Sequence, residues 1–185
     1  MAVAAAVTTL EWCFRPDLAP AAESAGREYG EIFEIVQEAG ADLVLLETVN
    51  SITEARVAAE EARRIALPIW VSFVCDEQGA LFTGETLEAA ARAIEPLGVE
   101  AILLNCAPPE DIAAGLDRLL EHTRLPVGAY PHIGRFDPPE WLFTDEYPPE
   151  RYRAVLDGWM ERGARILGGC CGTTPDHIAA IRSLG

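Results

Sequence analysis

The feature that most constrains the fold is a repeated alternation of short apolar runs with longer amphipathic segments. The apolar runs are unbroken, as expected for parallel strands that are buried on both faces. They cover residues 42–47, 68–74, 99–104, 125–130 and 164–168, and residues 3–9 are one further candidate. Helical periodicity is found in residues 21–39, 51–65, 84–97, 109–121 and 149–162, and a helix start is found at Thr174. Strands that are joined by crossover helices predict a parallel α/β fold, which we assign to one domain over residues 1–185.

Two architectures fit this alternation, an open α/β sheet and a barrel that lacks its first part. A complete (β/α)8 barrel usually needs about 250 residues and rarely fewer than about 200, whereas the chain has 185. The chain therefore has roughly two strand–helix units fewer than a complete barrel. An unclosed barrel exposes two strand edges, which invite pairing with another chain. We therefore expect a homo-oligomer that forms through these edges.

Charge and hydropathy exclude several classes of function. The formal net charge of −16 repels phosphate backbones, so we expect no nucleic-acid partner. The basic residues are all arginines, and without a lysine the chain cannot form a Schiff base with a substrate or with pyridoxal phosphate. No apolar run reaches the roughly 18 residues of a membrane helix. No basic segment precedes the apolar start of the chain. We expect a cytoplasmic protein with no membrane partner.

The strongest local signal is GGCCGTTP at residues 168–175, between a predicted strand and a predicted helix. Its glycines allow a sharp turn that aims the thiols of Cys170 and Cys171 at one point. Adjacent cysteines rarely close an unstrained disulfide, and the odd total of five cysteines disfavours a disulfide framework. Cys106 also ends a predicted strand, so its thiol should lie at the same face. Three thiolates predict a zinc site with an exchangeable fourth position, which is typical of catalytic zinc.

The remaining cysteines and the histidines suggest less specific roles. A metal-free redox pair is the alternative for the vicinal cysteines, although the usual Cys-x-x-Cys spacing is absent. We interpret Cys13 and Cys75 as small buried hydrophobes. His132 and His177 could bind a metal, but His177 falls in the first turn of a helix and is predicted to be solvated.

Two polar residues at predicted strands are candidates for substrate binding. Glu47 ends its strand, where a carboxylate usually faces the ligand and could hold an ammonium group. Its alternative role is that of a helix-capping or solvated acid. Ser72 is either a substrate contact or a core hydroxyl. Residues 132–147 are aromatic and have no period, so this segment is either a lid over the site or a surface loop with its own hydrophobic cluster.

These motifs together resemble the homocysteine S-methyltransferase family. The matching segments are GADLVLLETVNSITEA at residues 40–55, LLNCAPPE at residues 103–110 and GGCCGTTPDHI at residues 168–178. The order of motifs holds through the whole chain. The resemblance implies a (β/α)8 TIM barrel of which about strands 3–8 are present. The first two βα units, with a glycine-rich acidic motif that helps to bind homocysteine, have no counterpart, so residues 1–9 would form the third strand.

The resemblance also implies a function. It is that of a zinc-dependent methyltransferase that moves a methyl group from a small donor to the thiol of homocysteine, which yields methionine. Cys106, Cys170 and Cys171 would be the zinc ligands and Glu47 would bind the amino group of homocysteine. The usual Tyr-Pro-Asn of the family is Tyr-Pro-His here and ends at His132. The alternative is a catalytically inactive zinc-binding barrel fragment, or a subunit that needs a partner for the missing strands.

Overall fold

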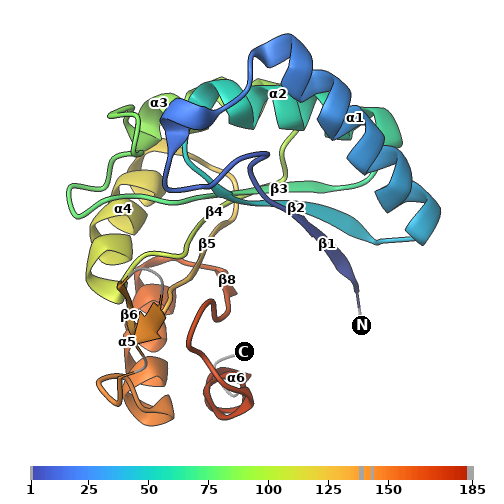
Figure 1. Ribbon diagram of the computed structural model, residues 1–185. Helices are drawn as coiled ribbons and strands as arrows, with labels where there is room; N and C mark the ends of the chain where they lie inside the picture. The colour runs from blue at the N-terminus through green and yellow to red at the C-terminus, as the bar shows by residue number, and fades with distance from the viewer. Residues whose placement is uncertain (1, 138–139, 143, 183–185) are drawn as a thin grey trace.

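The computed structural model describes residues 2–137, 140–142 and 144–182. Its centre is a six-stranded parallel sheet in the order β1-β2-β3-β4-β5-β8. The strands are β1 (Ala4–Val7), β2 (Leu43–Val49), β3 (Ile69–Phe73), β4 (Ala101–Asn105), β5 (Val127–Tyr130) and β8 (Ile166–Leu167). The sheet curls as part of a barrel, and the helices cover its outer face (Figure 1). This architecture confirms the predicted α/β fold and its partial-barrel form.

The helices follow the strands in strict alternation along most of the chain. They are α1 (Ala22–Ala39), α2 (Ile52–Ala62), α3 (Leu87–Ile94), α4 (Pro109–His122), α5 (Pro149–Arg162) and α6 (Pro175–Ile181). Short 3-10 turns are η1 (Pro16–Leu18), η2 (Arg63–Ile65) and η3 (Glu95–Leu97). Among the residues that the structure describes, no helix combines the length and hydropathy that crossing a bilayer requires.

The main core lies between the sheet and the helices. Val44 and Leu46 of β2 are fully buried on the outer face of the sheet, together with Tyr29 and Phe33 of α1, whose rings stack at 5.9 Å. This burial explains the unbroken apolar runs, because the outward side chains meet helices and the inward ones meet one another. The inner face carries a smaller cluster, in which the buried side chains of Leu103 and Tyr130 pack against the partly buried ones of Leu45, Trp70 and Ile166.

The start of α2 is capped by Ser51, but Glu54, three residues later, does not complete a capping box. Ser51 caps the helix as expected, because its hydroxyl accepts a hydrogen bond from the Glu54 N–H at 3.2 Å. The Glu54 carboxylate instead accepts hydrogen bonds from the Tyr29 hydroxyl at 2.9 Å and the Leu10 N–H at 3.0 Å. This buried acid therefore ties α1 and α2 to the β1–α1 loop.

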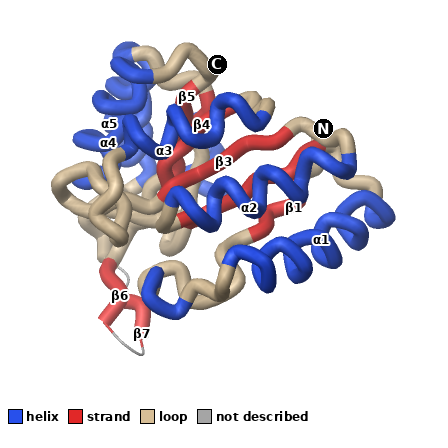
Figure 2. The backbone as a smooth tube through the Cα atoms, turned by 90° about the horizontal axis from the view of Figure 1, so that it is seen from above, coloured by secondary structure: helices blue, strands red, loops and turns tan. Residues whose placement is uncertain are grey.

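The segment at residues 132–147 contains more regular structure than its sequence indicates. Antiparallel strands β6 (Arg135–Asp137) and β7 (Glu140–Leu142) pair Arg135 with Leu142 and Asp137 with Glu140. The hairpin projects from the body of the protein beside the β1–α1 loop (Figure 2). Each strand is only three residues long, which is too short for an alternating pattern to stand out from the surrounding aromatic and proline residues.

Candidate metal centre

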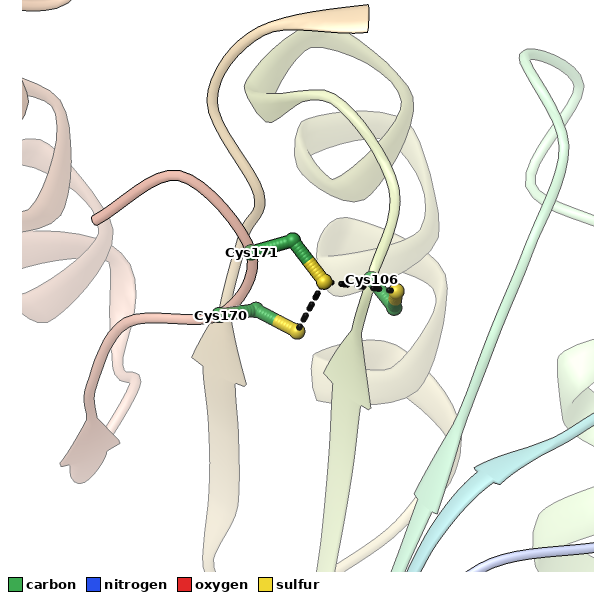
Figure 3. Close-up of side chains that lie close together, drawn as sticks. All are labelled: Cys106, Cys170 and Cys171. Atoms are coloured by element: carbon green, nitrogen blue, oxygen red, sulfur yellow. Dashed lines mark hydrogen bonds between the residues drawn. The ribbon is translucent and has the colours of Figure 1, made fainter. Parts of the chain in front are cut away.

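Three cysteine thiols meet at the carboxyl end of the sheet. Cys106 directly follows β4, and Cys170 and Cys171 follow β8 across two glycines. The Sγ atom of Cys171 lies 3.9 Å from that of Cys106 and 3.9 Å from that of Cys170 (Figure 3). All three sulfurs lie within 4.8 Å of one another. The structure therefore brings together the three cysteines that the sequence predicts as metal ligands, and we call them the thiol cluster.

The backbone on both sides of the thiol cluster is joined by one short segment, residues 131–133, which we call the strap. The Cys170 N–H donates to the carbonyl of Pro131 at 3.2 Å, and the Ile133 N–H donates to the carbonyl of Cys171 at 2.9 Å. On the other side, the His132 N–H donates to the carbonyl of Ala107 at 3.1 Å. The strap thus fixes the two cysteine-bearing loops relative to each other before any ligand binds.

The geometry of the thiol cluster fits a tetrahedral zinc ion. Sulfurs that each lie about 2.3 Å from a tetrahedral zinc are roughly 3.8 Å apart. Two of the sulfur pairs are separated by 3.9 Å, and all three pairs fall within 4.8 Å. Only small side-chain rotations would bring the sulfurs onto one ion. Three thiolates leave one position for an exchangeable ligand.

Hydrogen bonds among the thiols separate their acidities. The neighbouring thiol of Cys106 lowers the pKa of Cys170 to about 6, against the opposing effect of burial. The same interaction with Cys170, together with burial, raises the pKa of Cys106. Burial and the charge of Cys170 raise the pKa of Cys171. The site therefore favours one thiolate that is stabilised by two thiols, and a cation that binds there would displace the remaining protons.

The two other cysteines lie outside the thiol cluster. Cys75 is 1% exposed, its Sγ lies 3.8 Å from the carbonyl oxygen of Asp111, and burial raises its pKa to about 12. This agrees with the predicted buried hydrophobe. Cys13 is half-buried in the β1–α1 loop, and its pKa is raised first by burial and then by Cys171 and Cys170. It is therefore electrostatically coupled to the cluster without belonging to it.

Glu47 lies near the end of β2 on the side of the thiol cluster. Its carboxylate accepts a hydrogen bond from the Tyr130 hydroxyl at 3.3 Å, and its charge raises the pKa of Cys170. Tyr130 is nearly buried and has a raised pKa because of burial, so its hydroxyl stays protonated. The half-buried carboxylate thus accepts a hydrogen bond from Tyr130 and lies close enough to Cys170 for its charge to act on that thiol.

A buried polar network lies beneath the thiol cluster and was not predicted from the sequence. The Asn105 side chain accepts hydrogen bonds from the Ser72 hydroxyl at 2.7 Å and the Thr48 N–H at 3.0 Å, and it donates to the Thr48 hydroxyl at 2.9 Å. Thr48 and Cys106 both have positive φ angles, of 58° and 56°. The network connects the ends of β2, β3 and β4 and holds two strained residues in place. The sequence signals were Ser72, which was considered as a core hydroxyl, and the polar Asn105 at the end of an apolar strand.

The two candidate histidines lie in different surroundings. The prediction that His177 is solvated is wrong, since it is 6% exposed. Its Nε2 lies 2.9 Å from the carbonyl oxygen of Tyr147 and its Nδ1 accepts from the Thr174 N–H at 3.1 Å, so both nitrogens are used to cap α6 and to anchor the end of the hairpin segment. His132 is 9% exposed, and its Nδ1 has no hydrogen-bond partner among the described residues.

A family model described as Homocysteine S-methyltransferase matches residues 1–184. The methionine synthase of Mycobacterium leprae is 36% identical over 154 residues, which cover 78% of this chain and 13% of that protein. The selenocysteine Se-methyltransferase of Brassica oleracea var. italica is 33% identical over 156 residues, which cover 80% of this chain and 44% of that protein.

A solved structure agrees with the sequence relatives. The metallated form of the homocysteine methyltransferase MmuM from Escherichia coli superposes with a TM-score of 0.84 at 27% identity. The match covers all of this chain and 62% of the MmuM chain. The chain thus spans less than two thirds of the length of these relatives.

Proposed function

The chain belongs to the homocysteine S-methyltransferase family, and from that premise we propose that it takes part in moving a methyl group from a small donor to the thiol of homocysteine, which yields methionine. The observation that carries this proposal is the meeting of three thiols within 4.8 Å at the carboxyl end of a parallel sheet. In α/β barrels this end holds the active site.

We propose zinc as the cofactor, held by Cys106, Cys170 and Cys171. When bound, zinc acts as a Lewis acid that keeps a coordinated thiol deprotonated at neutral pH. The protein prepares for this by stabilising a thiolate at Cys170, whose pKa is about 6. It also excludes water from one side, because Cys106 is 8% exposed.

Glu47 and Ser72, the two residues predicted to bind substrate, take different parts in the proposal. Glu47, oriented by the Tyr130 hydroxyl, would hold the ammonium group of homocysteine through a charge-assisted hydrogen bond. Ser72 has an indirect part in the proposal, because its hydroxyl is fully buried and donates to Asn105. It would fix the strand end that precedes Cys106 and so position the substrate rather than touch it.

Because the relatives are longer than this chain, a second candidate function is also supported. In it, the chain is the zinc-binding part of a barrel and needs a partner for catalysis. The chain covers 62% of the MmuM chain, and β1 and β8 are the outermost strands of the described sheet. In this case zinc would bind to the chain alone, whereas methyl transfer would require the complementary strands. Pairing through these edges remains a prediction.

The first experiment is to measure zinc per chain by elemental analysis in the purified protein and in two variants. We expect about one zinc per chain, its loss in Cys170→Ser, and its retention in Cys75→Ala, which removes a thiol outside the cluster. Zinc-loaded protein is then assayed for methionine formation from homocysteine with sulfonium, ammonium and folate donors. Zinc without turnover favours the second candidate, and a folded protein without zinc contradicts both.

A further inference from the structure

Asn105 is a buried side chain that lies between two parts of the proposed site. It is the last residue of β4 and is 1% exposed. Cys106, a proposed zinc ligand, follows it directly in the chain, at the point where β4 ends (Figure 3). On β2, its hydrogen-bond partner Thr48 directly follows Glu47, the proposed site for an ammonium group. The Asn105 side chain therefore connects the backbone of a proposed metal ligand with the backbone of a proposed substrate-binding carboxylate.

Three hydrogen bonds fix the orientation of the Asn105 amide. Its Oδ1 accepts from the Ser72 hydroxyl at 2.7 Å and from the Thr48 N–H at 3.0 Å, and its Nδ2 donates to the Thr48 hydroxyl at 2.9 Å. A flipped amide would place its NH2 group against the Thr48 N–H, where two donors would face each other. Because Ser72 and Thr48 are also buried, a change in this arrangement would leave polar groups without partners inside the protein. The end of β4 is therefore held at one position relative to the end of β2.

The residues on either side of this connection have strained backbones. Thr48 and Cys106 have φ angles of 58° and 56°, in the left-handed region that residues with a Cβ rarely adopt. Such conformations persist only where the surrounding contacts determine them. Asn105 supplies these contacts, because two of its three hydrogen bonds go to Thr48 and because it is fixed directly before Cys106 in the chain. Without the amide, both residues would be free to return to extended conformations, and the directions of the Cys106 thiol and of the neighbouring Glu47 carboxylate would change.

An irregularity in β2 strengthens this dependence at the carboxylate. The pairing of β2 with β3 shifts its register between Leu46 and Val49, so Glu47 and Thr48 lie in the irregular stretch. Irregularities of this kind beside active sites change the direction in which a side chain points. The direction of the Glu47 carboxylate therefore depends on the conformation of Thr48, which the Asn105 amide holds.

These contacts set the distance between the Glu47 carboxylate and the Cys106 thiol, which we call the span. In the proposed function, homocysteine is held at both ends, with its ammonium group at Glu47 and its sulfur at the metal. The span must then match the length of the thiol acceptor, and cysteine is shorter than homocysteine by one methylene group. A single methylene group changes selectivity by roughly 10- to 200-fold in a well-shaped site. A residue that fixes the span therefore also selects the acceptor.

We propose that Asn105 is a positioning residue that sets the span, and that it thereby favours homocysteine over cysteine and holds Cys106 in place for the metal. It acts through Thr48 and Cys106 rather than by contact with the substrate or the metal. The inference rests on the proposed function, which it deepens by assigning the determinant of acceptor length.

The first part of the test measures metal binding, with cobalt(II) as a probe whose visible absorption reports its ligands. Metal-free protein is titrated with cobalt chloride, and zinc affinity is measured in competition with a chromophoric chelator. In Asn105→Ala, the dissociation constant for zinc should rise about 30-fold. The thiolate-to-cobalt charge-transfer absorption should fall by about one third, because Cys106 no longer coordinates. The control Phe33→Leu changes a core side chain of α1 that is 1% exposed, and it should lower stability but leave both metal readouts unchanged.

The second part measures the choice of acceptor without turnover. Homocysteine or cysteine is added to the cobalt-loaded protein, and the visible absorption is followed as the added thiol takes the exchangeable position. In the wild-type protein, the dissociation constant for cysteine should exceed that for homocysteine about 20-fold. In Asn105→Ala the ratio should fall to about twofold, whereas in Phe33→Leu it should keep the wild-type value. A loss of stability alone does not change this ratio.

The outcomes separate this inference from the proposed function. If the wild-type protein binds cobalt and prefers homocysteine but Asn105→Ala keeps the wild-type ratio and absorption, only the inference is wrong. If the wild-type protein binds cobalt but does not distinguish the two thiols, the span does not select the acceptor and the inference is overturned. A folded wild-type protein that binds neither cobalt nor zinc contradicts the proposed function, and the inference fails with it.

A second variant decides the question if Asn105→Ala does not fold. Thr48→Val removes only the hydroxyl that accepts from Nδ2 of Asn105 and keeps the hydrogen bond from the Thr48 N–H. The dissociation constant for zinc should rise about threefold, and the preference for homocysteine should decrease. Wild-type values for both in Thr48→Val would overturn the inference.

Discussion

The thiol cluster and an aromatic rim, which consists of Trp12, Phe14 and Phe82, lie at the same end of the sheet, but they are held in different ways. The cysteines follow strands, and backbone hydrogen bonds to the strap fix their loops. The rim residues lie on loops, are 36–50% exposed, and contact one another through ring faces and edges. The comparison teaches that the backbone fixes the positions of the cysteines, whereas the aromatic rim is formed by side chains on loops that can change without disturbing the sheet.

The largest expected effect concerns thiol reactivity in metal-free protein. At neutral pH, Cys170 should react with iodoacetamide roughly 1000-fold faster than Cys75. Cys170 has a pKa of about 6 and is a thiolate, whereas Cys75 has a pKa of about 12 and is 1% exposed. Mass spectrometry of the alkylated peptides over time gives both rates.

Two controls make this contrast decisive. In urea, both thiols regain ordinary pKa values and should react at similar rates. In the folded protein, the Cys170 rate should fall as the pH is lowered through about 6, because protonation removes the nucleophile. Equal rates for the two cysteines in the folded protein would contradict the structure.

The second prediction compares two glycines with nearly equal backbone angles. Gly172 has φ +81° and Gly84 has φ +82°, but an added Cβ at Gly172 would lie 2.1 Å from the carbonyl oxygen of Ile133, whereas at Gly84 nothing lies within 4 Å. Gly84→Ala should cost about 1 kcal/mol and Gly172→Ala about 3 kcal/mol or more of unfolding free energy. Urea denaturation measures both, and equal costs would show that the strap does not constrain the cysteine loop.

A smaller effect is expected from the buried network beneath the cluster. Asn105→Ala leaves the Ser72 hydroxyl and the Thr48 N–H without their acceptor. It should cost about 2–3 kcal/mol. Ser72→Ala removes one donor and leaves Asn105 bonded to Thr48, so it should cost only about 1 kcal/mol. Thermal unfolding distinguishes the two variants. If Asn105→Ala is as stable as Ser72→Ala, the network does not stabilise the fold.

The smallest effect is predicted for the hairpin. Leu142 of β7 is 38% exposed. Leu142→Ala should therefore change the free energy of unfolding by no more than about 0.5 kcal/mol. Leu104→Ala in β4, where the side chain is fully buried, is the matched control and should cost about 2–5 kcal/mol. A large loss of stability in Leu142→Ala would mean that the hairpin is part of the core.

Much of the fold could be predicted from the sequence because its signals are local. Each unbroken apolar run became a strand and each periodic segment became a helix, with ends that differ by a few residues, as in β2, which extends to Val49 rather than Glu47. The meeting of Cys106 with Cys170 and Cys171 could also be predicted, since parallel strands bring their carboxyl ends to one edge.

The remaining features depend on contacts between distant segments. The burial of His177 arises because its ring reaches the carbonyl of Tyr147, which is 30 residues away. The Asn105 network needs the register of three strands, and the cavity lined by Phe14, Phe82 and Cys106 needs the loops after β1, β3 and β4 to converge. None of these leaves a periodic pattern, so the sequence indicated His177 and Ser72 as candidates but not their partners.

The order of strands in the sheet has a consequence for how the protein is made. Because the strands pair in the order in which they occur in the chain, each new strand can dock on a neighbour that has already left the ribosome. The thiol cluster does not form in this stepwise manner. Cys106 emerges early, but Cys170 and Cys171 follow the last strand of the sheet. If zinc binds to the thiol cluster as proposed, its capture should follow the synthesis of β8, because a chain interrupted before β8 carries only one thiol of the cluster, that of Cys106.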